Sequence, residues 1–81
     1  MQREEAIQII NETQTDYKGE QHVLRGLQIL AKYNDNLQLA FEHDQIWAEN
    51  FDTSIKKMTK EDIIELAVYG WFESFNSWSH H

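Results

Sequence analysis

The chain has 81 residues and no cysteine, and its 14 acidic and 7 basic residues give a formal net charge of −7. This length allows one domain with one small core. The lack of cysteine excludes disulfides and cysteine-based zinc sites, and the negative charge argues against direct binding to nucleic acid. No apolar run approaches the roughly 18 residues of a membrane span, and no signal-peptide pattern opens the chain. We therefore expect one soluble, cytoplasmic domain over residues 1–81.

Two helices are expected in the first half of the chain. Residues 3–13 carry an isoleucine-rich apolar stripe, with two glutamates in the first turn. Residues 20–33 form the stronger pattern, because their side chains follow two neighbouring helical faces. The first face, which we expect to be buried in the core, holds Val23, Leu24, Leu27, Leu30 and Ala31, and the second holds His22, Gly26, Ile29 and Tyr33. A glycine in mid-helix costs about 1 kcal/mol relative to alanine, so Gly26 predicts a close backbone contact.

Residues 37–49 fit both a hairpin and a helix. In a hairpin, a two-residue turn at 43–44 places Ile46 opposite Phe41, and Trp47 points to the other face. In a helix, most of the same apolar residues lie on one stripe. The scarcity of β-branched residues and the lack of an Asn-Gly or Asp-Gly turn favour the helix, and composition alone leaves the two near even.

The second half of the chain predicts a loop, a helix and one or two strands. Residues 50–58 are polar and are expected to be the loop. Thr59 is a predicted N-cap with Asp62 in the capping-box position, and Gly70 is the predicted stop of the helix. Residues 71–81 alternate aromatic and polar side chains, and we expect their rings to close the core. The chain therefore predicts an α+β fold, with two to three helices packed on a short antiparallel sheet in the order α-α-β-β-α-β.

Four short motifs resemble a group of small, mostly uncharacterised proteins of bacteria, phages and prophages. The motifs are Gly26-Leu27-Gln28-Ile29-Leu30-Ala31-Lys32-Tyr33, Glu42-His43-Asp44-Gln45-Ile46-Trp47, Glu61-Asp62 before a helix that ends in Gly70-Trp71, and Ser77-Trp78. The resemblance covers residues 22–79, implies an α+β domain, and moves residues 37–49 toward the hairpin. It supplies no activity. The helix at 3–13 and the missing glycine after Trp47-Ala48 depart from the pattern of the group.

The acidic stretch around Trp47 is the strongest candidate for a site. An aromatic side chain ringed by carboxylates has the composition of a protein-binding patch. The alternative, which the sequence favours slightly, is that the first helix or the aromatic tail covers Trp47. The predicted binding residues are Glu42, His43, Asp44, Trp47, Glu49 and Asp52. We expect a non-catalytic protein that binds a basic partner surface, including one that normally holds nucleic acid. Together with the resemblance to phage proteins, this implies an inhibitor of a bacterial host defence protein, similar in kind to anti-CRISPR proteins.

Two other functions stay open from the sequence. The first is a metal-dependent or acid–base enzyme centred on Glu42-His43-Asp44, which is disfavoured because neighbouring side chains on a strand point to opposite faces. The chain also lacks a Gly-x-Ser-x-Gly elbow and a glycine-rich phosphate loop, so no catalytic residue, metal ligand or cofactor is assigned. The second is a module that self-associates through a free sheet edge near residues 77–81.

Overall fold

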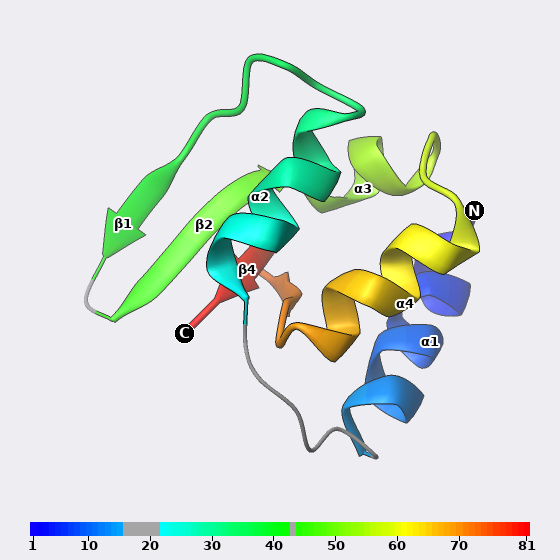
Figure 1. Cartoon of the computed structure of the whole chain (residues 1–81). Helices are drawn as coiled ribbons and strands as arrows, with labels where there is room; N and C mark the ends of the chain where they lie inside the picture. Colours follow the sequence, from blue (N-terminus) through cyan, green and yellow to red (C-terminus); the bar gives the residue numbers. More distant parts are fainter. Residues whose placement is uncertain (16–21, 43) are drawn as a thin grey trace.

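The computed structural model of the chain describes residues 1–15, 22–42 and 44–81 and has the expected α+β fold (Figure 1). In chain order the elements are α1 (Arg3–Thr15), α2 (Val23–Ala31), β1 (Ala40–Glu42), β2 (Gln45–Asn50), α3 (Phe51–Ile55), α4 (Lys60–Val68), β3 (Phe72–Ser74) and β4 (Ser77–His80). The predicted order of helices and strands is confirmed, and α3 and the second of the two final strands are additions to it. The hairpin at residues 37–49 is confirmed as well, since β1 and β2 pair directly.

The four strands form one antiparallel sheet in the order β1-β2-β4-β3. The register of the first hairpin pairs Phe41 with Ile46 and Ala40 with Trp47, as the alternation predicted. Strand β4 lies between β2 and β3, so β1 and β3 are the edges of the sheet. The free edge expected near residues 77–81 is therefore wrong, because β4 pairs on both sides. The predicted hairpin register fixes which side chains share each face.

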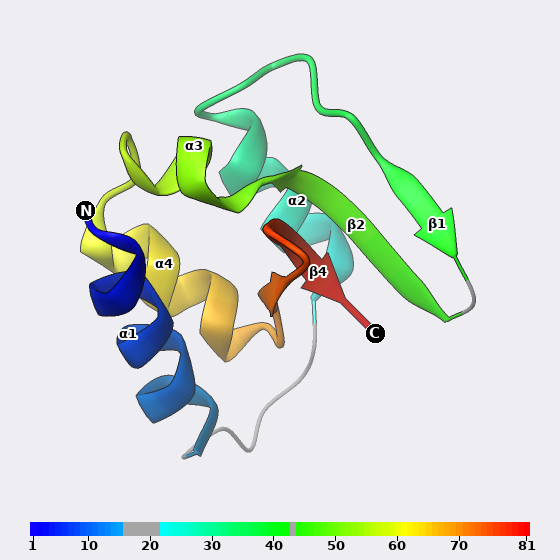
Figure 2. The same cartoon turned by 180° about the vertical axis from the view of Figure 1, so that it is seen from behind.

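The described helices leave one face of the sheet uncovered. Figure 1 shows α2 crossing the β2–β4 pair, and Figure 2 shows the same pair from behind with none of the described helices in front of it. On the covered side, α2 and α4 pack with α1 and α3 around a core that includes Ile29, Phe51, Ile63, Trp71 and Trp78. We call the uncovered side the outer face. Trp47 and its paired residues project there.

Gly26 in α2 lets the helix approach the buried indole of Trp71. A Cβ added at Gly26 would lie 1.9 Å from Trp71 Nε1, so no other residue fits unless the ring moves. The predicted close approach is confirmed, although it is made to a side chain rather than to backbone. The helix turns the Gly26 and Ile29 side toward the core and leaves Leu24 69% exposed. The expectation that Leu24 lies in the core is wrong, because only the glycine side can approach the indole.

The loop expected at 50–58 is in part a helix, α3. The Asn50 side chain accepts a hydrogen bond from the backbone N–H of Thr53 at 2.8 Å and so caps this helix. Phe51 and Ile55, one helical turn apart, are both buried. An N-cap residue followed by apolar residues four positions apart indicates a helix. This signal was missed because the helix is short and lies among polar residues.

Both predicted ends of α4 are confirmed. Thr59 Oγ1 accepts from the backbone N–H of Asp62 at 3.1 Å. At the other end, Gly70 has a φ of 93°, and the N–H of Trp71 donates to the carbonyl of Leu66 at 2.9 Å. This is a Schellman arrangement, which directs the chain from the helix into β3.

Candidate functional site

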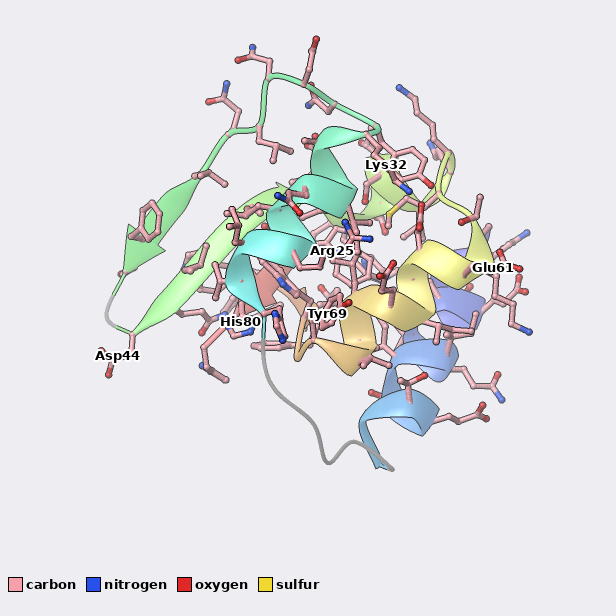
Figure 3. The ribbon with its side chains drawn as sticks, in the orientation of Figure 1. Arg25, Lys32, Asp44, Glu61, Tyr69 and His80 are labelled. Carbon is pink, nitrogen blue, oxygen red and sulfur yellow. The ribbon has the colours of Figure 1, made fainter. Side chains whose placement is uncertain are left out.

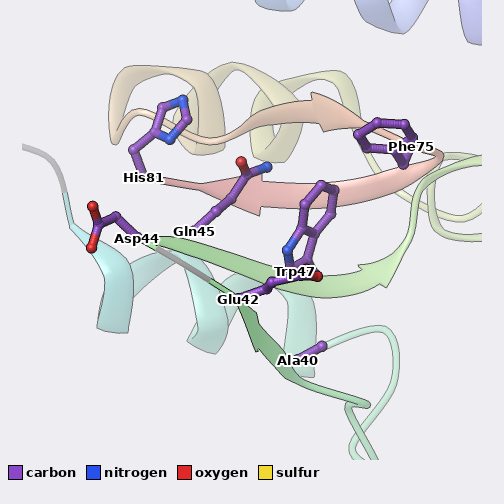
Figure 4. Close-up of a pocket in the computed structure, with 7 residues that line it drawn as sticks. All are labelled: Ala40, Glu42, Asp44, Gln45, Trp47, Phe75 and His81. Carbon is purple, nitrogen blue, oxygen red and sulfur yellow. The ribbon is translucent and has the colours of Figure 1, made fainter.

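A cavity of about 770 Å³ opens on the outer face of the sheet (Figure 4). It is lined by residues of β1, β2, the β3–β4 turn and the end of the chain: Ala40, Glu42, Asp44, Gln45, Trp47, Phe75 and His81. Two of these residues are aromatic rings, two are carboxylates and one is an amide. The cavity therefore joins an apolar wall to an acidic rim.

Strand pairing explains why these residues meet. Directly paired residues of an antiparallel sheet project to the same face, so Trp47 shares its face with Ala40 on β1 and with Ser79 on β4. Two residues closer to the hairpin turn, Glu42 pairs with Gln45, and both project to that same face. Phe41 and Ile46, which lie between these pairs, point to the opposite face, where Phe41 at the sheet edge stays 70% exposed. The β1–β2 hairpin therefore supplies most of the cavity wall.

Phe75 completes the wall from the β3–β4 turn. Its side chain is 90% exposed, and its ring centroid lies 5.5 Å from that of Trp47 at an interplanar angle of 51°. Phe75 has a φ of 50°, and Asn76 after it has a φ of 59°, as in a type I′ turn. Asparagine tolerates this left-handed conformation, whereas for phenylalanine it is a strained one.

Asn76 holds this turn in place. Its backbone carbonyl accepts from the N–H of Phe51 at 2.9 Å, and its side-chain oxygen accepts from Arg3 at 3.0 Å and from the N–H of Asp52 at 3.2 Å. Backbone strain persists only where the surroundings fix it, and these contacts do so for Phe75. The prediction that the aromatic residues of the tail close the core is right for Trp71 and Trp78 and wrong for Phe75. The sequence signal that was missed is that only Phe75 and Asn76 separate two short strands. A two-residue hairpin turn of this type needs positive φ at both positions.

The cavity wall also contains a buried donor. The side-chain nitrogen Nε2 of Gln45 is inaccessible to solvent and has no hydrogen-bond partner among the described residues. An unsatisfied buried donor costs about 1–3 kcal/mol, so native proteins contain few of them. The Gln45 side chain lies on the cavity side of β2, so rotation of its amide brings this donor within reach of a ligand acceptor (Figure 4).

Three of the six predicted binding residues meet at this cavity: Glu42, Asp44 and Trp47. Glu49 does not line it and instead accepts a hydrogen bond from the side-chain amide of Asn34. Asp52 also lies elsewhere, where it pairs with Arg3 at 2.7 Å. The hydrogen bonds from Arg3 to Asp52 and Glu73 raise the pKa of the Arg3 guanidinium. The remaining predicted residue, His43, lies outside the described residues.

Among the described carboxyls, the one with a shifted pKa is Asp62, which lies away from the cavity. Asp62 accepts from the Tyr33 hydroxyl and pairs with Lys32 Nζ at 2.9 Å, which joins the end of α2 to the start of α4. Burial raises the pKa of the Asp62 carboxyl, but the hydrogen bonds from Lys32 and Tyr33 outweigh burial and leave it below the ordinary value of 3.8. Among the described residues, no group of three or more histidine, cysteine, aspartate or glutamate side chains could hold a metal ion.

Comparison with protein-family models, curated proteins and solved structures finds no match for this chain. The resemblance to small phage and bacterial proteins therefore remains a prediction from the quoted residues. Within the described parts of the chain, no helix combines the length and apolar character needed to cross a membrane.

Proposed function

We propose that the chain is a protein-binding module and that its binding surface is the outer face of the sheet around Trp47 and Phe75. The observation that carries this proposal is the exposed, strained Phe75. A 90% exposed ring contributes little to the core, and its positive φ costs stability. Strained residues with exposed aromatic side chains are typical of binding sites, where the partner buries the ring.

The composition of the surface supports a protein partner with a basic surface. Aromatic anchors surrounded by polar residues are typical of the energetic centres of protein interfaces. Glu42 and Asp44 lie at the rim of the cavity, in a chain with a net charge of −7. We propose a cytoplasmic setting, and an inhibitor of a host defence protein is the role that the sequence resemblance favours. This account expects binding that weakens as salt concentration rises.

A capture experiment with matched variants tests this proposal. The immobilised chain is exposed to bacterial lysate, and bound proteins are identified for the wild type, Phe75→Ala and Leu24→Ala. Leu24 is also an exposed apolar residue, at 69%, but it lies on α2. We expect a protein that is retained by the wild type and Leu24→Ala and lost by Phe75→Ala.

Equal retention by all three proteins, or no protein retained above the blank resin, would contradict the proposal. Circular dichroism checks that each variant is folded. Sedimentation of the free chain separates binding of a partner from self-association, for which β1 and β3 supply the sheet edges.

A further inference from the structure

We infer that the cavity beside Trp47 takes an arginine side chain from a basic segment of the partner, with a backbone carbonyl of that segment accepting from Gln45. This inference rests on the proposed protein-binding function and names the chemistry of the partner. Three features of the cavity support it: the paired rings, the carboxylates and the unsatisfied amide.

The paired rings favour a flat side chain. The ring centroids of Trp47 and Phe75 lie 5.5 Å apart and the rings are tilted by 51°, so together they form one continuous aromatic surface in the cavity wall. A guanidinium is planar and stacks on aromatic faces, which is worth about 0.5–2 kcal/mol depending on its exposure. A leucine side chain would gain only the apolar contact.

The charges favour a cation over an anion. Glu42 and Asp44 line the cavity, and none of its described lining residues is a lysine or an arginine. Figure 3 shows Asp44 at the tip of the β1–β2 hairpin, well separated from the basic side chains of Arg25 and Lys32. An acidic peptide or a phosphate group would meet like charge there. A guanidinium can instead form charge-assisted hydrogen bonds with the carboxylates.

Gln45 distinguishes a peptide from a free cation. Its buried Nε2 is a donor and needs an acceptor, whereas a guanidinium or a polyamine has only donors. A peptide that delivers an arginine side chain also carries backbone carbonyls beside it. One such carbonyl satisfies the Gln45 amide, so the geometry points to an arginine within a peptide segment.

The test is a nuclear magnetic resonance titration of the ¹⁵N-labelled intact chain with short capped peptides. The probe is acetyl-Ala-Arg-Ala-amide, and the readouts are the indole N–H of Trp47 and the side-chain amide of Gln45. We expect both signals to shift with the arginine peptide. The peptide with citrulline in place of arginine keeps the shape without the charge, and we expect about 10-fold weaker binding. Spermidine should shift Trp47 and leave the Gln45 amide unchanged.

Matched variants complete the titration. Asp44→Asn should weaken binding of the arginine peptide about 3-fold, as for an exposed ion pair, and Asp52→Asn should leave it unchanged because Asp52 pairs with Arg3 elsewhere. Equal binding of the citrulline peptide, equal binding of a lysine peptide, or tighter binding of a glutamate peptide would overturn the inference. If the arginine peptide fails while capture from lysate still depends on Phe75, the protein-binding function stands and only the arginine assignment is wrong.

Discussion

The two sides of the sheet use most of their aromatic residues in opposite ways; Phe41 on the edge strand β1 is the exception, because it points to the core side and is 70% exposed. On the core side, Trp71 and Trp78 are fully buried, and both indole N–H groups donate, to the His22 carbonyl at 3.2 Å and to Ser54 Oγ at 2.8 Å. On the outer face, Phe75 is 90% exposed beside Trp47, and the buried Gln45 amide lacks a partner. On the core side, the two indole rings are therefore buried and their N–H groups have hydrogen-bond partners, as a stable fold requires. The strained, exposed Phe75 and the unsatisfied Gln45 donor both lie on the outer face, which is typical of a functional surface.

On the core side, we expect the largest loss of stability from Gly26→Ala. The new methyl group would lie 1.9 Å from Trp71 Nε1, and the fully buried indole has no room to move away. We expect a loss of about 3 kcal/mol in the free energy of unfolding, at the upper end of the cost of overpacking. Urea denaturation followed by circular dichroism measures it.

Gln28→Ala on the exposed side of the same helix serves as the control for the glycine variant. It should change the free energy of unfolding by less than about 0.5 kcal/mol. If Gly26→Ala were as stable as this control, the close packing of α2 on Trp71 would be wrong.

The outer face should respond in binding more than in folding. We expect Trp47→Ala to weaken capture of the partner about 30-fold, which corresponds to about 2 kcal/mol for an aromatic anchor. The half-buried Trp47 also supports the hairpin, so thermal unfolding is measured beside binding. Leu24→Ala should retain the affinity of the wild type. A variant that loses stability but keeps full affinity would assign Trp47 to the fold instead.

A buried carboxylate and an exposed carboxylate give a second contrast between the core and the outer face. Asp62 is nearly buried and paired, whereas Asp44 is exposed at the cavity rim. We expect Asp62→Asn to lower the free energy of unfolding by about 1–3 kcal/mol at neutral pH, and Asp44→Asn to change it by less than about 0.5 kcal/mol. Denaturation of the two variants in parallel checks this.

The direction of the Asp62 pKa shift predicts how the stability difference between wild type and Asp62→Asn depends on pH. The folded pKa of Asp62 lies below its ordinary value of 3.8, so its stabilising effect is fully present above that value. The effect is lost as pH falls through the lower pKa of the folded protein. The gap between wild type and Asp62→Asn should therefore close in strong acid. A gap that stays constant from pH 7 to pH 2 would show that the charge is not the stabilising feature.

Local patterns predicted most of the fold. Once the resemblance favoured a hairpin over a helix at residues 37–49, alternation predicted its register and placed Trp47 on the outer face, and Thr59 and Gly70 marked both ends of α4. The orientation of α2 was not predictable, because it depends on Trp71, which is distant in sequence. A hydrophobic pattern shows that a helix has an apolar face and not which partner that face will meet.

The candidate site was half predictable for a related reason. Glu42, Asp44 and Trp47 are close in sequence and lie on one hairpin, so local reasoning grouped them. Phe75 comes from a distant turn, and Gln45 matters only because its amide is buried in the cavity wall. Asp52 was misassigned because its partner, Arg3, is 49 residues away in the chain. Contacts between distant segments require the structure.

Substitution of Phe75 is the most direct test of whether the β3–β4 turn is strained to present a binding residue. It separates the effect of backbone strain on stability from the effect of the ring on binding. Asparagine suits positive φ, so Phe75→Asn should raise the free energy of unfolding by roughly 0.5–1 kcal/mol, whereas the β-branched Phe75→Val should lower it. Both variants remove the ring, so both should lose capture of the partner. The measurement is urea denaturation paired with capture. Loss of stability in Phe75→Asn, or retained capture in either variant, would contradict the claim that this turn is strained to present a binding residue.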